Sequence, residues 1–314
     1  MERSNSDPIK VIVISGPTGV GKSSLAVELA LRFQGEIINA DCMQVYRGFD
    51  VGTAKPSLED RQKVPHHLFD ILEPEEEFNA GRFQLLASKV IEEIWLRKRI
   101  PIVVGGTGLY IRALLKGLID VPSEKRHTLR EELNAKTTQE LYEELQIIDT
   151  KASEKIHPND RVRILRALEI YYLTQKPPTE LWKRHNFGEK RYNALCIFLY
   201  MERSELYKVL EKRCDEMVSS GLMEEVKELL KKHLPQLKPF QSIGYRHIIK
   251  HILQNIPLME CVKEFKRDTK RYAKRQFIWF KKEPEFLWVP SAQKLHVFRL
   301  VEEFIKSGDN QWLF

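Results

Sequence analysis

A glycine-rich loop near the N-terminus constrains the fold more than any other part of this sequence. It reads GPTGVGKS and fits the phosphate-binding pattern GxxxxGK[ST] in full. The β-branched run Val11–Ile14 precedes the loop and the amphipathic segment Lys22–Phe33 follows it, which predicts a strand, a loop and a helix in that order. The residues of the loop are Gly16, Pro17, Thr18, Gly19, Val20, Gly21, Lys22 and Ser23.

The residue types in this loop are those that phosphate binding requires. Glycine lets backbone N–H groups turn inward without a clash at Cβ, and these groups and the following helix N-terminus bind anionic oxygens. Lys22 adds a positive charge, and the Ser23 hydroxyl can ligate Mg²⁺. Most proteins with this loop use a nucleoside triphosphate, but the pattern specifies only phosphate oxygens and leaves the rest of the ligand open.

Strand and helix signals alternate through the first third of the chain. The segment GEIINAD, residues 35–41, is typical of a short strand that ends at Asp41, and residues 80–100 carry apolar side chains at helical spacing. The segment PIVVGGTGLYIRALL, residues 101–115, predicts a strand, a glycine turn and another helix. This βαβ order predicts an α/β fold with a mainly parallel sheet covered by helices.

The character of the sequence changes after about residue 117. Strand signals are absent up to about residue 182, and the segment predicts helices at Lys125–Lys136, Thr138–Ile148 and Asp160–Thr174. A buried strand returns at YNALCIFLYMER, residues 192–203, and the helices predicted after it are Ser204–Ser219 and Leu222–His233. We therefore expect a core in two parts, residues 1–121 and 185–314, with an all-helical insertion at residues 122–184.

Composition narrows the class of protein. The 314 residues carry a net charge of +7 with a pI near 9.0, and 42% of them are hydrophobic, enough for a packed core. The cysteines are scattered without CxxC spacing, which argues against a zinc ribbon or a disulfide framework: Cys42, Cys196, Cys214 and Cys261. The polar start MERSNSDP lacks a signal-peptide pattern, and no run of eighteen apolar residues occurs. We expect a cytoplasmic protein that does not associate with membranes.

Two further strand ends carry candidate site residues. The carboxyl ends of parallel strands face the ligand crevice, so Asp41 should point toward the phosphate-binding loop, where it could hold Mg²⁺ or act as a general base. Gly105-Gly106 permit close backbone approach, and Thr107 offers a hydroxyl to a substrate. A capping aspartate and a plain tight turn are the structural alternatives. The aspartate that usually ends the Walker B strand is missing, which argues against an ordinary NTPase.

The C-terminal third contains a strongly basic segment, residues 262–282. Its basic residues are Lys263, Lys266, Arg267, Lys270, Arg271, Lys274, Arg275, Lys281 and Lys282, and its only acidic ones are Glu264 and Asp268. Aromatic residues lie between them: Phe265, Tyr272, Phe277, Trp279 and Phe280. The segment predicts either an amphipathic helix with a solvated basic face or a helix laid against a nucleic acid, with cations on phosphates and some aromatic rings near bases.

Six motifs occur in one order along the chain: GPTGVGKS, INADCMQVYRGFDVGTAKP, PIVVGGTGLY, IHPNDRVRILRALEI, QSIGYR and YAKRQFIWF. Together they resemble the tRNA dimethylallyltransferases, or isopentenyltransferases, from about residue 9 to residue 283. The resemblance implies transfer of a dimethylallyl group from its diphosphate to N6 of adenosine 37, which is flipped out of the anticodon loop. It also implies a P-loop NTPase-like core, a helical insertion that grips the anticodon stem-loop, Mg²⁺ as cofactor, and a monomer.

The resemblance also implies residue roles. Residues Thr18–Ser23 would bind the diphosphate, Lys22 and Ser23 with Mg²⁺ would stabilise it as it leaves, Asp41 would be the general base, and Arg213 would lie near the diphosphate and the tRNA. Thr107 would contact the flipped adenosine. The positions that match tRNA-contacting segments are Asp41, Cys42, Met43, Gln44, Val162, Arg163, Ile164, Leu165, Arg166, Gln241, Ser242, Ile243, Gly244, Tyr245 and Arg246, with a looser match at Arg130. Lys270, Lys274 and Arg275 are the cations that we expect to bind RNA from the basic helix.

The sequence departs from the family pattern where Arg161-Val162 follows HPND, and two other classes of function stay open. A small-molecule or nucleoside kinase would explain the loop, Asp41 and the sheet, but neither the basic helix nor the GTAKP string. A non-enzymatic RNA-binding protein would need neither Lys22 nor Asp41. Arg163 and Arg166, three residues apart on one helix face, suit nucleic-acid contacts but also a helix with surface ion pairs. The turn around Arg246 likewise suits a nucleotide contact or an ordinary turn.

Overall fold

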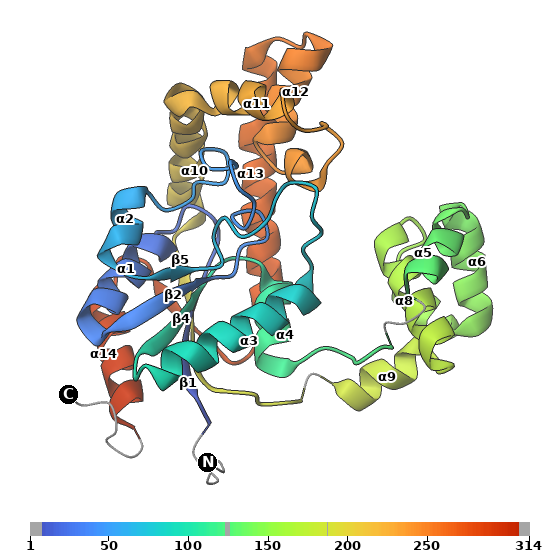
Figure 1. Ribbon diagram of the computed structural model, residues 1–314, viewed down its shortest axis with the longest axis horizontal. Helices are drawn as coiled ribbons and strands as arrows, with labels where there is room; N and C mark the ends of the chain where they lie inside the picture. The colour runs from blue at the N-terminus through green and yellow to red at the C-terminus, as the bar shows by residue number, and fades with distance from the viewer. Residues whose placement is uncertain (1–7, 123–125, 187, 308–314) are drawn as a thin grey trace. The chain divides into compact units, whose positions relative to one another are not determined.

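The computed structural model describes residues 8–122, 126–186 and 188–307. The chain divides into two compact units: a larger unit formed by Met1–Leu115 and Lys190–Phe314, and a helical unit formed by Lys116–Glu189 (Figure 1). Among the described residues, no helix has the length and apolar character needed to span a membrane.

A six-stranded parallel sheet forms the centre of the larger unit. The strands lie in the order β3-β2-β4-β1-β5-β6, and every neighbouring pair is parallel. The strands are β1 (Lys10–Ser15), β2 (Gly35–Asn39), β3 (His66–His67), β4 (Ile100–Val104), β5 (Asn193–Tyr200) and β6 (Phe286–Pro290). β2 and β4 are buried along their whole length, and β1 beyond its first residue, as expected for parallel strands covered on both faces.

Alternate residues of β1 enter two different cores. Val11 and Val13 pack into one cluster with Phe83 and Phe280, whereas Ile12 and Ile14 pack into another that includes Leu25. Successive side chains of a strand point to opposite faces, so one short strand connects both cores. The helices of the larger unit are α1 (Lys22–Phe33), α2 (Leu58–Lys63), α3 (Ala80–Leu96), α4 (Gly108–Lys116), α10 (Arg203–Met217), α11 (Met223–Leu230), α12 (Tyr245–Gln254), α13 (Leu258–Phe280) and α14 (Lys294–Lys306).

The helical unit has its own core. Its helices are α5 (Arg126–Asn134), α6 (Thr138–Ile148), α7 (Thr150–Ser153), α8 (Arg161–Thr174) and α9 (Pro178–His185). Leu141 and Leu145 of α6 pack against Ile164 and Leu168 of α8 in a small apolar cluster. The predicted helix Lys125–Lys136 therefore corresponds to α5, with Lys125 itself outside the described residues.

The break predicted at Gly221 has a particular form. Of the predicted helices Ser204–Ser219 and Leu222–His233, the first corresponds to α10, which ends at Met217, and the second to α11, which ends at Leu230, and the backbone between them leaves helical geometry at Ser220 and Gly221. Gly221 has a φ of 98°, a left-handed conformation that glycine adopts readily and that other residues adopt at a cost. The glycine thus joins α10 to α11 without a separate loop.

Glu36 of β2 is a buried carboxylate whose side chain is only 4% exposed. Burial alone would raise its pKa, but hydrogen bonds from Arg97 and His67 outweigh that effect and hold the pKa below its usual range. A carboxylate with a lowered pKa in the folded state stabilises the fold fully above its unfolded pKa near 4.5, and this contribution is lost as the pH falls through the folded value.

We expect Glu36→Gln to lower the free energy of unfolding at pH 7 by about 2 kcal/mol, because Arg97 loses its charged partner. The difference from the wild type should narrow below pH 4.5. Urea denaturation at pH 7 and at acidic pH measures both effects. Glu59→Gln, which alters a carboxylate that is 81% exposed, is the matched control. A difference that stays constant over this pH range would contradict the assignment.

Candidate active site

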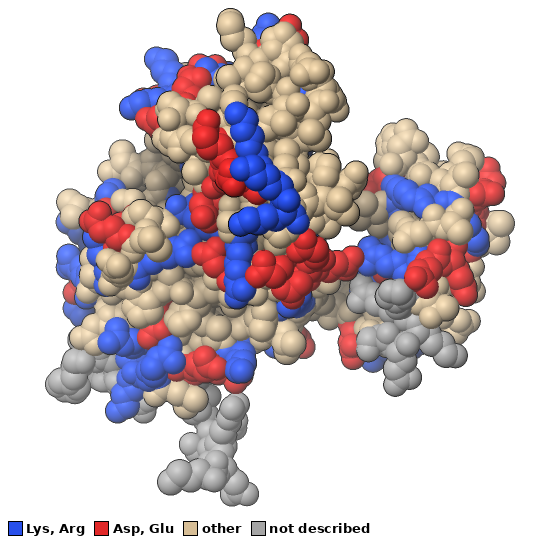
Figure 2. Space-filling view, turned by 45° about the horizontal axis from the view of Figure 1, so that its top comes forward, with Lys and Arg blue, Asp and Glu red and all other residues tan. Residues whose placement is uncertain are grey.

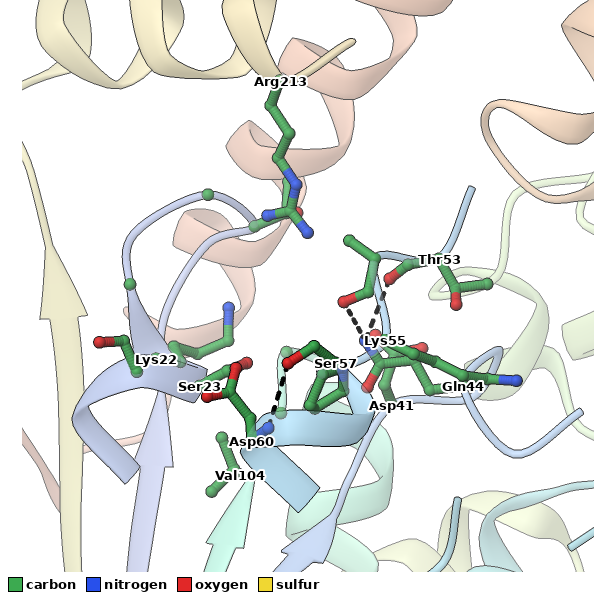
Figure 3. A pocket seen from close by; sticks show the side chains of 18 of the residues that line it. Lys22, Ser23, Asp41, Gln44, Thr53, Lys55, Ser57, Asp60, Val104 and Arg213 are labelled. Atoms are coloured by element: carbon green, nitrogen blue, oxygen red, sulfur yellow. Dashed lines mark hydrogen bonds between the residues drawn. The ribbon is translucent and has the colours of Figure 1, made fainter. Parts of the chain in front are cut away.

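Three loops at the carboxyl ends of β1, β2 and β4 meet at one edge of the sheet. The phosphate-binding loop follows β1, Asp41 follows β2, and Gly105-Gly106-Thr107 follow β4. All three loops contribute to the lining of a cavity of about 640 Å³, although Thr107 itself does not, and Arg213 of α10 and Tyr272 of α13 also line it. Figure 3 shows Lys22, Asp41 and Arg213 around this space. The structure therefore brings together all four residues or loops predicted from strand ends and from the resemblance to carry out chemistry.

The phosphate-binding loop has the backbone shape that its glycines predict. Gly19 and Gly21 have φ values of 81° and 91°, in the left-handed region. A Cβ on Gly16 would lie 2.5 Å from the carbonyl oxygen of Leu199 on β5, so only glycine fits beside that strand. The loop leads directly into α1, whose first N–H groups have no carbonyl partner within the helix and can bind an anion.

Lys22 is held inside the loop. Its Nζ donates to the carbonyl oxygens of Gly16 and Pro17 at 3.0 and 2.7 Å. Burial and the nearby Arg213 guanidinium lower the pKa of Lys22 to about 7, although Asp41 acts in the opposite direction. A bound anion would raise this pKa again, so binding of phosphate groups and full protonation of Lys22 favour each other.

Arg213 supplies a second cation opposite the loop. Its Nη1 lies 3.5 Å from Oγ1 of Thr18, and burial lowers the pKa of its guanidinium. Two partly buried cations that face one cavity raise its electrostatic potential, because low-dielectric walls weaken the screening by water. The cavity is therefore suited to a ligand with at least two negative charges, such as a diphosphate.

Asp41 is fixed by a tight turn. Its backbone N–H donates to Oδ1 of Asn39 at 2.9 Å, and its own Oδ1 accepts the N–H of Met43 at 2.8 Å. This arrangement is the local side-chain turn that aspartate favours, and here it also orients the carboxylate toward the cavity. The capping role considered from the sequence and a chemical role are thus compatible in the same residue.

Thr107 connects the ends of β2 and β4. Its Oγ1 accepts the N–H of Cys42 at 3.3 Å, and its own N–H donates to the carbonyl of Ala40 at 3.4 Å. The Tyr272 side chain also hydrogen-bonds Thr107. The pKa of the Tyr272 phenol is raised, mainly by burial and to a smaller extent by the neighbouring Asp41 and Cys42. Tyr272 therefore stays a neutral hydroxyl group beside Asp41.

A second cavity of about 280 Å³ adjoins the first. Thr18, Asp41, Thr53, Arg213 and Tyr272 line both. The residues that line only the second cavity include the apolar side chains of Met43, Leu210, Met217, Ile243 and Phe265. A cation-rich space for an anion and a more apolar space thus meet at the Asp41 carboxylate.

The segment that covers this meeting point, residues 41–57, is held at several points. Nε2 of Gln44 donates to the carbonyl oxygens of Thr53 and Ala54 at 3.0 and 3.2 Å. Lys55, whose side chain is 2% exposed, pairs with Asp50 and Asp70. Gln44 was predicted to contact tRNA, and in the structure its amide nitrogen instead closes this segment on itself.

A carboxylate from α11 holds the same segment from the outside. Glu225 accepts the N–H groups of Asp50, Val51 and Gly52 at 3.0, 2.8 and 3.3 Å, and the hydroxyl of Tyr245 also donates to it. Tyr245 is fully buried, so its side chain packs inside the larger unit, and the tRNA contact expected of the segment Gln241–Arg246 stays a prediction. The motifs QSIGY and DVGTAKP are therefore connected in the fold through Glu225. Tyr245 of the first motif donates to Glu225, and this carboxylate accepts the N–H groups of Asp50, Val51 and Gly52 in the second.

Other predicted nucleic-acid contacts are also buried. Ile164 and Leu165 of α8 are 0% and 8% exposed within the core of the helical unit, so their side chains pack rather than bind. Phe265 and Phe280 of α13 are 2% and 1% exposed, so these two of the five aromatic residues in the basic segment pack in the core of the larger unit. A helix at the edge of a core buries its large rings, because they contribute the most apolar area.

The remaining predicted contacts differ in exposure. In the helical unit Val162 and Arg163 are exposed, whereas Arg130 and Arg166 pair with the buried Glu169. In the larger unit Gln241, Ser242, Ile243 and Arg246 line the second cavity; Gln241 is exposed, the other three are half-buried, and Gly244, the N-cap of α12, is buried.

The basic face of α13 is only partly free of acidic partners. Lys274 and Arg275 are exposed, whereas Lys270 pairs with Glu211 and Lys266 with Asp215. Arg246 of α12 similarly pairs with Asp268. Figure 2 shows the same mixture, with acidic and basic side chains alternating over the visible surface of the larger unit. The charge available to a polyanion is therefore smaller than the sequence of α13 suggests.

Comparisons with known proteins agree with this geometry. The family model described as "IPP transferase" matches residues 44–283, and one described as "Isopentenyl transferase" matches residues 9–70. The chain belongs to the IPP transferase family. A tRNA dimethylallyltransferase 2 of Geotalea uraniireducens is 48% identical and covers 90% of this chain and 93% of its own. A tRNA dimethylallyltransferase 1 of Pelobacter propionicus is 46% identical, with 91% and 94% covered.

Solved structures of the IPP transferase family have the same fold. The tRNA isopentenylpyrophosphate transferase of Bacillus halodurans has a TM-score of 0.70 at 38% identity, covering 94% of this chain and 96% of its own. A eukaryotic dimethylallyltransferase acting on tRNA has a TM-score of 0.84 at 32% identity, covering 96% and 80%. The predicted α/β fold with a P-loop NTPase-like parallel core is confirmed.

Several residues that shape the site were not singled out from the sequence. Lys55 occurs in the family string GTAKP, so its motif was visible although its buried ion pairs were not. Gln276 likewise occurs in the family motif YAKRQFIWF, whereas Glu225 lies in none of the motifs; the loop partners of both lie 170 or more residues away along the chain. Residues of this kind become visible only when the fold brings distant segments together.

Gly52 provides a test of how the segment 41–57 is held. A Cβ on Gly52 would lie 2.4 Å from Cε2 of Tyr245 and 2.8 Å from Cδ1 of Leu222. We expect Gly52→Ala to lower the free energy of unfolding by about 1–3 kcal/mol, because the buried ring or the segment must shift. Thermal unfolding measures this. Gly188→Ala, whose Cβ would meet no described atom within 4 Å, is the control, and equal stability of the two variants would contradict the assignment.

Proposed function

We propose that this protein transfers a dimethylallyl group from dimethylallyl diphosphate to N6 of adenosine 37 in tRNA. Membership of the IPP transferase family and the names of its relatives support this proposal. The single observation that carries it is the position of Asp41, where the cation-lined cavity of the phosphate-binding loop meets a more apolar cavity. A donor with a diphosphate and a short hydrocarbon group suits this pair of spaces.

In the proposed reaction the residues of the site have separate tasks. The bond between the allylic carbon and the diphosphate oxygen breaks, and its electron pair stays on that oxygen. Residues Gly16–Ser23, with Lys22 and Arg213, would bind the diphosphate and stabilise its growing charge. The N6 lone pair forms the new C–N bond, and the N6 proton passes to the Asp41 carboxylate. Thr107 and Tyr272 would position the adenosine beside Asp41.

The site has oxygen donors that fit Mg²⁺. The hydroxyl of Ser23 and the carboxylate of Asp60 line the same cavity, and Mg²⁺ prefers oxygen ligands. Within the described residues there is no group of three or more His, Cys, Asp or Glu side chains that could hold a metal ion. The ion would therefore depend on diphosphate oxygens as further ligands, as is usual for Mg²⁺ at phosphate sites, and it would help to neutralise the leaving group.

The RNA side of the proposal rests on exposed cations. Lys274 and Arg275 on α13 and Arg163 on α8 are exposed and would contact phosphates of the anticodon stem-loop. In this proposal the helical unit grips the stem and the protein acts in the cytoplasm as a monomer. A small-molecule kinase explains the phosphate-binding loop but leaves the similarity to tRNA-modifying enzymes over most of the chain unexplained.

The decisive experiment is nucleoside analysis of tRNA after incubation with the protein, dimethylallyl diphosphate and Mg²⁺. We expect N6-(dimethylallyl)adenosine with the wild type and at least a hundredfold slower formation with Asp41→Asn, which cannot accept the N6 proton. Binding of tRNA to the variant should stay within a few-fold of the wild type.

Two outcomes would contradict this part of the proposal. Absence of the modified nucleoside with the wild type would reject the function, and turnover of Asp41→Asn within tenfold of the wild type would reject Asp41 as the base. Asp60→Asn is a useful comparison, because its carboxylate lines the same cavity but is assigned to the metal. Raising the Mg²⁺ concentration should partly restore Asp60→Asn and should not restore Asp41→Asn.

The exposed basic face of α13 provides a further test. Neutralising Lys270, Lys274 and Arg275 together should weaken tRNA binding and reduce the slope of log Kd against log salt by about two, because roughly 0.7–0.9 counterions are released per phosphate contact. Lys270 should contribute least, because it already pairs with Glu211. Fluorescence titration over a range of salt concentrations measures the slope.

Three exposed lysines elsewhere serve as the control: Lys89, Lys231 and Lys306. Changing these to glutamine removes the same number of charges and should leave the salt dependence nearly unchanged. If both triple variants have the slope of the wild type, the basic face of α13 is a solvated surface.

A further inference from the structure

Gln276 on the inner side of α13 bridges two loops of the site. It is 5% exposed, and its Oε1 accepts the backbone N–H of Thr18 at 2.9 Å. Its Nε2 donates to the carbonyl oxygen of Gly106 at 3.0 Å. One side chain thus connects the phosphate-binding loop after β1 to the glycine turn after β4, although 170 residues separate Gln276 from Gly106.

Glutamine suits this position for a chemical reason. A buried amide is stable only when both its carbonyl and its NH₂ group find partners, and here the partners are one N–H and one C=O of two different loops. Methionine has a similar length but makes neither bond, and ionised glutamate can accept but cannot donate. The two loops are therefore held in a fixed relation by a residue that offers both functions at once.

The glycine turn has the shape that this contact requires. A Cβ on Gly106 would lie 2.0 Å from Nε2 of Gln276, and a Cβ on Gly108 would lie 2.2 Å from Nε1 of Trp279. The close approach predicted for Gly105-Gly106 is thus, at Gly106, an approach of a side chain of α13, and Gly108, for which no such approach was predicted, meets a second one. The backbone of the turn touches these side chains directly, so a small movement of Gln276 would move both loops.

The bond to Thr18 also affects how the loop presents its amides. Thr18 is the third residue of the loop, and its N–H points to Gln276. The residues that follow, Gly19 and Gly21–Ser23, line the cavity, where their amides can bind an anion. An unsupported loop rich in glycine would lose more conformational entropy when a ligand orders it.

We propose that Gln276 is a positioning residue for the diphosphate: it preorganises the phosphate-binding loop and joins it to α13. The same helix carries Tyr272 beside Asp41, places Arg275 at the second cavity next to Tyr272, and exposes Lys274. A single helix therefore contributes to the anion site, to the meeting point of the two cavities and to the outer surface. The identity of the anion rests on the function proposed above, whereas the bridge itself does not.

The test uses the full-length protein with Mg²⁺ and inorganic pyrophosphate as the probe, in a calorimetric titration. We expect Gln276→Met to bind pyrophosphate about tenfold more weakly than the wild type, since two hydrogen bonds of ordinary strength are lost. In turnover the KM for dimethylallyl diphosphate should rise while the KM for tRNA changes little. Ile278→Gln alters the same helix at a side chain that is 50% exposed and should behave as the wild type.

Gln276→Glu separates positioning from packing and remains informative if the methionine variant is unstable. When protonated, glutamate can donate to Gly106 and accept from Thr18 as glutamine does, and when ionised it cannot donate. The ratio of variant to wild-type Kd for pyrophosphate should therefore be smallest at acidic pH and should increase as the pH rises through the pKa of the introduced carboxyl group.

Two results would overturn the inference. One is a folded Gln276→Met protein, by thermal unfolding, that binds pyrophosphate within twofold of the wild type. The other is a Kd ratio for Gln276→Glu that does not depend on pH. If the wild type binds pyrophosphate in this Gln276-dependent way but does not modify tRNA, the proposed function fails while the positioning role of Gln276 stands.

Discussion

The site depends on one constraint, the parallel pairing of β1 with β4 on one side and β5 on the other. Ile12 pairs with Ile102 of β4 and with Leu195 of β5, so the hydrogen bonds of three strands fix a common direction and register. Because β2 pairs with β4 in the same direction, the loops after β1, β2 and β4 leave the sheet at one edge. Phosphate-binding loop, Asp41 and Thr107 are neighbours for this reason and could not be so in an antiparallel sheet.

The electrostatics of the site are a consequence of this convergence. Lys22 and Arg213 are both partly desolvated, and burial lowers the pKa of each of them. Their charged forms are therefore less stable in the free protein than they would be in water, and an anion bound between them would relieve this. The Asp41 carboxylate favours the charged form of both cations and partly offsets the effect of burial.

The parts of the site that follow from strand ends could be predicted from the sequence, since a motif and its flanking strand locate Lys22, Asp41 and Thr107 without any long-range information. Burial could not be predicted in the same way. Tyr245 and Ile164 occur in motifs that resemble tRNA-contacting segments, but only the packed fold shows that one supports Glu225 and the other fills the helical core. The strand β6 and the helix α14 were not predicted, although FLWVP is a short apolar run and KLHVFRLVEEFIK carries apolar residues at helical spacing.

Helix α13 shows why charge and aromatic content alone are ambiguous. Over its 23 residues the buried positions Cys261, Phe265, Thr269, Ala273, Gln276 and Phe280 recur every three or four residues, and the cations lie between them. Phe265 and Phe280 belong to the periodic buried stripe, whereas Tyr272, Phe277 and Trp279 are half-buried and Arg275 lies over the Tyr272 ring, so alternation in sequence alone does not decide which rings and cations meet in space. Thr269 and Gln276 are the polar members of the stripe; Thr269 donates to a carbonyl of its own helix, whereas Gln276 has its partners outside the helix. Here the partners are the two loops that would hold the reacting groups.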